Sequence, residues 1–177
     1  MYAPGSHKKI STKYLTISDD YPVLIKIGVQ DGFPGGLNFT DGKLAAKHLA
    51  ELGFDALEIS QGLRGPSDED TEFSTNINTL NREAYYSNWC SQIKSQVKVP
   101  VMMVGGLRTF KLMEEVIQKK EANFISLSRP LIREPNIIND WKRGDRHTAK
   151  CISCNECFES LLKGETLRCV QLEKQNS

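Results

Sequence analysis

The sequence has no long apolar run, and none of its runs approaches the roughly 20 residues of a membrane-spanning helix. The sequence also lacks an excess of charge of either sign, because its 23 Lys and Arg residues nearly balance its 22 Asp and Glu residues and leave a net charge of +1. Binding to nucleic acid or to an anionic membrane surface therefore has no electrostatic support. The opening residues MYAPGSHKK contain no apolar core of the kind that a secretory signal has. We expect a cytoplasmic protein with neither a nucleic-acid nor a membrane partner.

Internal repeats and low-complexity tracts are also absent, and the composition, 39% hydrophobic and 25% charged, is ordinary for a globular protein. The 177 residues suffice for one domain with its own core. Cysteine is sparse until the end, where four of the five lie within the last 27 residues. Without an export signal, this clustering favours metal or thiol chemistry over a disulfide framework. Cys90 stands apart in a helical pattern and is predicted to be an ordinary buried thiol.

The middle of the chain alternates between short apolar runs and helical patterns. The runs predict four strands, at 23–29, 54–60, 99–104 and 124–127. The patterns between and after them predict helices that begin near Thr40-Asp41 and cover 81–96, 110–120 and 135–145. This alternation indicates parallel strands with right-handed crossovers, and a doubly wound sheet and a barrel both fit it.

Two of the predicted turns have the chemistry of a phosphate site. Gly105-Gly106 ends the third strand, and Ser128-Arg129-Pro130 ends the fourth. Exposed backbone amides and a guanidinium both favour an anion. The last two units of a TIM barrel commonly hold a phosphate in this way. Lys26, inside the first strand, is expensive to bury unless it meets an anion, a carboxylate or solvent, and its place on the wet side of the strand is an equal alternative.

Five segments match a known family in order and spacing: YPVLIKI, LAELGFDALEIS, VPVMMVGGLRT, ANFISLSRPLIREP and CISCNEC. The chain resembles the C-terminal half of the old yellow enzyme family of NADH:flavin oxidoreductases, especially the branch near 2,4-dienoyl-CoA reductase. The resemblance implies about four β/α units of a TIM barrel, with a half barrel over 21–147, an irregular segment over 1–20 and a cysteine-rich tail over 148–177.

The resemblance also implies that the half barrel binds FMN. By it, Lys26 contacts the pyrimidine edge of the flavin and stabilises the anionic reduced form. Gly105 and Gly106 hold the phosphate after strand seven of the full barrel, and Ser128 and Arg129 hold it after strand eight. The family more often has glycine at position 128, but serine keeps the N–H and adds a hydroxyl. Arg108 is expected at the surface or at a helix start.

The activity implied is transfer of hydride from NAD(P)H through FMN to an activated alkene, such as an enone or an enoyl thioester. A full barrel takes about 250 residues or more. The first four units, with the family's substrate-binding histidine pair and proton-donating tyrosine, have no counterpart here. We therefore expect a fragment that is incompetent alone and pairs with a complementary half or with itself, because a half barrel exposes sheet edges and an apolar face.

Two alternatives remain open for the function. One is an inactive or structural half barrel that binds a phosphate ligand or pairs with a partner half. The other is a different phosphate-binding barrel, such as an isomerase or aldolase, although the series IKI, GGLRT and SRPLIREP argues against it.

The cysteines of the tail are Cys151, Cys154, Cys157 and Cys169. By the resemblance, they correspond to the ligands of a 4Fe–4S cluster, since soft irons favour thiolates. The spacing departs from the family by one residue, because two residues rather than three separate the second and third cysteines. A tetrahedral zinc site is a second interpretation. Four reduced thiols without a metal are the third.

Overall fold

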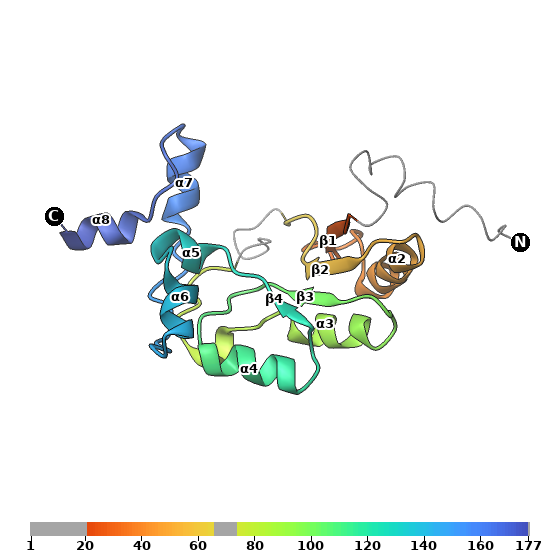
Figure 1. Ribbon diagram of the computed structural model, residues 1–177. Coiled ribbons are helices and arrows are strands. Elements are labelled where there is room, and N and C mark those ends of the chain that lie inside the picture. Colours follow the sequence, from red (N-terminus) through yellow and green to blue (C-terminus); the bar gives the residue numbers. More distant parts are fainter. Residues whose placement is uncertain (1–20, 66–73, 177) are drawn as a thin grey trace, which may run out of the picture. The chain divides into compact units, whose positions relative to one another are not determined.

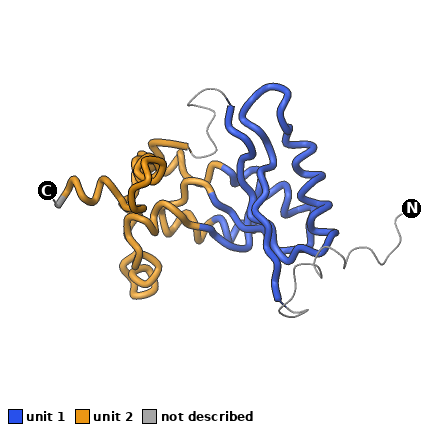
Figure 2. Tube along the Cα trace, turned by 90° about the horizontal axis from the view of Figure 1, so that it is seen from above, with its two compact units in different colours: residues 1–72, 86–104, 116–126 blue, residues 73–85, 105–115, 127–177 orange. Residues whose placement is uncertain are grey.

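The computed structural model describes residues 21–65 and 74–176, so the predicted irregular segment 1–20 lies outside the described residues. The chain divides into two compact units (Figure 2). Unit 1 comprises residues 1–72, 86–104 and 116–126, and unit 2 comprises residues 73–85, 105–115 and 127–177. Each unit is therefore assembled from three separate stretches of the chain. Across the described ranges, no helix is long and apolar enough to cross a membrane.

Unit 1 contains a sheet of four parallel strands (Figure 1). The strands are β1 (Leu24–Gly28), β2 (Ala56–Ser60), β3 (Val101–Met103) and β4 (Phe124–Ile125). All four predicted strands are confirmed, each slightly shorter than its apolar run. Their order in the sheet is β1-β2-β3-β4. A sheet that keeps winding in one direction with right-handed crossovers is the pattern of a barrel, so the chain has the fold of half a TIM barrel.

One face of the sheet is buried under helices. Helices α2 (Phe39–Glu51) and α3 (Ser87–Lys94) pack against this sheet and against each other. The side chains beneath them alternate along the strands, as a period of two requires. The fully buried members are Leu57, Ile59, Val101 and Met103. These β-branched and long apolar side chains form the core of unit 1.

The opposite face carries a row of four side chains in register across the strands. The row runs through Lys26, Glu58, Met102 and Phe124, which are Cα partners from strand to strand. Phe124 is 56% exposed, and Leu24, two residues before Lys26, is 51% exposed. Within the described part of the chain, this face is thus open, as expected for the inner face of half a barrel.

Two predicted helix starts are wrong. Asn38, rather than Thr40 or Asp41, caps α2, since its side chain accepts the backbone N–H of Asp41. The helix predicted over 81–96 begins only at Ser87, after a short 3-10 turn at Leu80–Arg82. The interruption has a local cause: Ala84 adopts a positive φ of 52°, which a right-handed helix cannot accommodate.

Unit 2 consists mainly of short helices. Helix α4 (Phe110–Gln118), whose first six residues belong to this unit, and α6 (Ile137–Lys142) confirm the predicted helices there. Helices α5 (Arg129–Arg133), α7 (Glu156–Leu162) and α8 (Val170–Asn176) were not predicted. The buried apolar side chains of the unit are Ile77, Leu107, Met113, Ile137, Trp141 and Ala149.

Arg108 joins the three stretches of unit 2. It is 9% exposed and lies two residues before the first residue of α4, so of its two expected places the surface is wrong and the helix start is right. Its guanidinium donates to the carbonyl of Ala149 from Nε (3.1 Å) and Nη2 (2.8 Å), and to the carbonyl of Ile77 from Nη1 (2.9 Å). The buried carboxylate of Glu83 accepts the backbone N–H groups of Arg108 and Thr109, both at 2.8 Å, at the start of α4. A buried charge with its donors satisfied in this way fixes the geometry of its surroundings.

We predict that Arg108→Met lowers the free energy of unfolding by about 3 kcal/mol, because two buried carbonyls lose their donors. Urea unfolding followed by circular dichroism measures the loss. The matched control is Arg143→Met, since Arg143 is exposed and pairs with Asp140 at the surface; its cost is expected to stay below about 0.5 kcal/mol. Equal costs for the two variants would contradict the role assigned to Arg108.

Candidate cofactor and metal sites

The backbone of the turn after β3 packs closely against the side chains of Tyr85 and Ile77. Gly105 and Gly106 have positive φ values of 122° and 69°. A Cβ on Gly106 would lie 2.7 Å from Cε1 of Tyr85 and 2.9 Å from Cγ2 of Ile77. A side chain at position 106 is therefore excluded both by the backbone conformation and by its neighbours. The turn presents backbone amides in a form that only glycine allows.

The turn after β4 leads directly into α5. Ser128 is the exposed N-cap residue of this helix, and its side chain makes no capping hydrogen bond. Arg129 is half-buried, and its Nη1 donates to the carbonyl of Ser74 at 2.8 Å and to Oδ1 of Asn155 at 2.7 Å. The guanidinium predicted for a phosphate is thus held in place by two neutral acceptors, which leave its positive charge available.

Tyr85 brings the two turns together, and the sequence analysis missed it. Its ring packs against Gly106, as the contact above shows. Burial raises the pKa of the Tyr85 phenol, and the charge and hydrogen bonding of Arg129 partly offset that effect. Gly106 and Arg129, both predicted phosphate residues, therefore share Tyr85 as a neighbour within unit 2.

Lys26 belongs to unit 1 and has an ionic partner. Its Nζ lies 2.6 Å from Oε1 of Glu58, and Oε2 of Glu58 accepts from Oγ of Ser126 at 2.7 Å. Burial alone would raise the pKa of Glu58, but the hydrogen bonds from Lys26 and Ser126 outweigh it and hold this pKa below its usual value. The lysine therefore meets both a carboxylate and solvent, since its side chain is 59% exposed.

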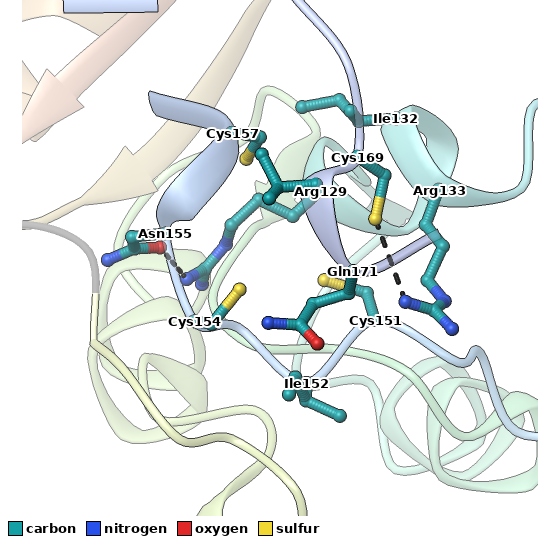
Figure 3. Close-up of a pocket in the computed structure, with 11 residues that line it drawn as sticks. Arg129, Ile132, Arg133, Cys151, Ile152, Cys154, Asn155, Cys157, Cys169 and Gln171 are labelled. Atoms are coloured by element: carbon teal, nitrogen blue, oxygen red, sulfur yellow. Dashed lines mark hydrogen bonds between the residues drawn. The ribbon is translucent and has the colours of Figure 1, made fainter. Parts of the chain in front are cut away.

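The four cysteines of the tail line one pocket of unit 2 (Figure 3). Cys151 and Cys154 lie in a loop where Ser153 and Asn155 have positive φ values of 56° and 63°, and Cys157 follows as the second residue of α7. The backbone N–H of Ser153 donates to Sγ of Cys151 at 3.4 Å. Cys169 reaches the same pocket from the residue before α8. Two residues of α5, Arg129 and Arg133, also line the pocket.

The donor set of this pocket suits a soft metal centre. Burial and the neighbouring Cys151 and Cys154 raise the pKa of the Cys157 thiol. Four thiols match the preference of zinc and of iron–sulfur clusters for sulfur. The described residues contain no group of three or more metal-ligating side chains in binding geometry, so the sulfurs line the pocket without forming a closed ligand set. Cys90, in contrast, is fully buried with a pKa raised to about 12, which confirms it as an inert thiol.

Comparison with known proteins decides the family. Residues 14–147 match the model of the NADH:flavin oxidoreductase / NADH oxidase family. The chain belongs to this family. The match confirms the resemblance to NADH:flavin oxidoreductases found in the sequence.

Individual members of the NADH:flavin oxidoreductase family are similar at low identity. The NADH oxidase of Thermoanaerobacter brockii is 28% identical over 144 residues, which are 78% of this chain and 21% of the relative. A metal reductase of Desulforamulus reducens is 22% identical over 156 residues, 87% of this chain and 22% of the relative. The chain thus spans about a fifth of the length of these curated relatives. The solved structure of a 2-naphthoyl-CoA reductase complex superposes with a TM-score of 0.74 at 19% identity, over 92% of this chain and 24% of that one, and shows the shared fold.

The ion pair between Lys26 and Glu58 is expected to make the free energy of unfolding depend on pH. Because the folded-state pKa of Glu58 is lowered, its stabilising effect is complete above the unfolded pKa of about 4.3 and disappears as the pH falls through the folded pKa. We expect Glu58→Gln to cost about 0.5–1 kcal/mol of unfolding free energy at pH 7, and less as the pH drops below about 4.3. Urea unfolding at a series of pH values measures this, with Glu51→Gln, exposed on α2, as control. A difference that grows toward acid pH would contradict it.

Proposed function

We propose that this chain carries the phosphate-binding part of an FMN-dependent NAD(P)H oxidoreductase. Membership of the NADH:flavin oxidoreductase family over residues 14–147 is the observation that supports this most strongly. The two turns of unit 2 add local support, because one places the backbone amides of Gly105 and Gly106 at positive φ and the other brings a fixed guanidinium at Arg129. An anionic phosphate is favoured by both groups.

In this proposal each residue has a distinct task. The amides of Gly105 and Gly106 and the amide and hydroxyl of Ser128 donate to the ribityl phosphate, and Arg129 neutralises its charge. Lys26 supplies positive charge to the pyrimidine edge of the flavin, where Glu58 keeps the ammonium in one orientation. When bound, FMN supplies hydride chemistry between NAD(P)H and an activated alkene, such as an enone or an enoyl thioester.

The chain is proposed to be incompetent as a reductase by itself. It spans about a fifth of the relatives it matches, and its described units contain four of the eight β/α units of a complete barrel. An inactive half barrel that binds a phosphate ligand is the competing function. The two differ in whether the isoalloxazine ring, and not the phosphate alone, contributes to binding.

Titration with FMN and with riboflavin tests the phosphate site. We expect FMN to bind at least tenfold more tightly than riboflavin, because riboflavin lacks the phosphate that charge-assisted hydrogen bonds recognise. In Arg129→Gln, this preference falls about tenfold while riboflavin binding is unchanged. Quenching of flavin fluorescence measures both affinities, and Arg143→Gln, in which an exposed arginine is lost, is the control. Equal affinity of the unaltered chain for the two flavins would overturn the proposal.

A thiolate-bound metal centre in the cysteine pocket is a second proposal, with a 4Fe–4S cluster as its first occupant and zinc as the alternative. Its support is the convergence of Cys151, Cys154, Cys157 and Cys169 on one pocket. When bound, such a cluster would supply one-electron transfer. The chain's own contribution is four soft donors and two nearby guanidinium groups.

We also propose that the open face of the sheet is covered by a partner, either a complementary barrel half or a second copy of the chain. Two large apolar side chains, Leu24 and Phe124, are more than half exposed there. Among the described residues, β1 and β4 each pair on one side only. Unpaired strand edges and an exposed apolar face together favour association.

Size-exclusion chromatography of the purified chain tests this pairing. We expect a species larger than the 19.9 kDa monomer, and a shift toward the monomer in Phe124→Ser, since that change removes apolar area from the face. Leu162→Ser is the control, because Leu162 is 73% exposed on α7, which belongs to unit 2 and not to the sheet. A stable, well-folded monomer at all concentrations would contradict the proposal.

A further inference from the structure

Arg133 is a buried cation whose hydrogen bonds are incomplete. The residue, at the end of α5, is 7% exposed. Its Nη1 donates to Sγ of Cys169 at 3.6 Å, and its Nη2 donates to Oε1 of Gln175 at 2.8 Å. Its Nε is buried and has no hydrogen-bond partner among the described residues. In Arg108 all three guanidinium nitrogens donate to carbonyls, whereas in Arg133 a buried N–H donor is left unsatisfied, which is a cost that a purely structural role does not offset.

The pocket that Arg133 lines contains donors for a metal and positive charge for an anion. Figure 3 shows its guanidinium beside Cys169, and that of Arg129 beside Asn155, on the wall that the four cysteines share. No carboxylate belongs to the described lining of this pocket. A divalent ion or cluster bound by four thiolates carries net negative charge. Two guanidinium groups complement that charge, whereas they would repel a bare metal ion.

The position of Cys169 depends on the contacts that hold α8, the helix that follows it. The tail helix α8, which follows it, is held by Glu156, whose carboxylate accepts from Gln171 and from Lys174, both at 2.8 Å. Arg133 is the second attachment, since it binds Cys169 itself and Gln175 on the same helix. A cation, the guanidinium of Arg133, therefore donates directly to the sulfur of Cys169.

We propose that Arg133 is the positioning residue and counter-charge of the metal centre in the cysteine pocket. Its Nη1–H holds the Cys169 sulfur at the pocket, and the charge of its guanidinium complements the anionic centre. The inference rests on the proposed thiolate-bound centre and assigns to it a cation outside the ligand set. Partners of this kind typically change metal affinity by 10- to 100-fold when they are lost.

Zinc affinity measured by competition with a chromophoric chelator, on the full reduced chain under anaerobic conditions, tests the proposal. Zn²⁺ alone is the probe, because it reports four thiolates without requiring flavin or activity. We expect Arg133→Gln to weaken Zn²⁺ binding at least tenfold relative to the unaltered chain. Arg133→Lys, which keeps the charge but loses the planar fork, is expected to lose less than the Gln variant but more than twofold.

Gln175→Ala is the matched control, since it removes the other acceptor of Arg133 without altering charge. It is expected to leave Zn²⁺ affinity within twofold of the unaltered chain. A loss as large as that of Arg133→Gln would show that Arg133 only docks the tail, and would overturn the proposal. Arg133→Gln within twofold of the unaltered chain would overturn it too. If circular dichroism shows that Arg133→Gln is unfolded, the Zn²⁺ affinity of Arg133→Lys is the test instead. An affinity of Arg133→Lys equal to that of the unaltered chain would then contradict the proposal.

Cys154→Ser separates this inference from the metal centre on which it rests. If the unaltered chain binds Zn²⁺ no more tightly than Cys154→Ser, the cysteine pocket is not a metal site, and the role of Arg133 falls with it. If the unaltered chain binds tightly and Arg133→Gln binds equally well, the metal site stands and only the role of Arg133 is refuted.

Discussion

The buried guanidinium of Arg108 is the contact on which unit 2 depends. It links carbonyls at Ile77 and Ala149, which lie 31 and 41 residues away in the sequence. Two of the joined stretches contain a candidate site. Gly105-Gly106 ends two residues before Arg108, and Cys151, the first cysteine of the pocket, follows two residues after Ala149. A single satisfied buried charge thus fixes both the phosphate turn and the cysteine pocket in one unit, which local helix propensity could not do.

Helix α5 connects the two candidate sites. It begins at the turn proposed for the phosphate and ends at the wall of the cysteine pocket. Arg129 and Arg133 are four residues apart, so one helical turn places both guanidinium groups on the same side. Pro130 lies in the first turn of the helix, where its ring fixes φ near the helical value and where the backbone N–H that it lacks would have no partner within the helix. In the proposed function, these five residues would supply positive charge both to the phosphate of FMN and to the thiolate centre.

What the sequence predicted correctly depended on local patterns. The four strands follow from short apolar runs, and the glycine turn follows from Gly105-Gly106, whose positive φ no other residue type adopts readily. The partners of charged residues were not predictable, because Glu58 faces Lys26 through strand register 32 residues away. The burial of Arg108 was not predictable for the same reason. The helix predicted over 81–96 failed because the positive φ of Ala84 has no signal in side-chain periodicity.

The central claim is that the two turns of unit 2 hold the phosphate of FMN. Amide chemical-shift mapping by nuclear magnetic resonance, with FMN and riboflavin added in turn to the labelled chain, tests it most directly. The account predicts that FMN moves the amide signals of Gly105, Gly106 and Ser128, and that riboflavin leaves them in place. Identical shifts with both flavins, or FMN shifts that spare all three amides, would contradict it.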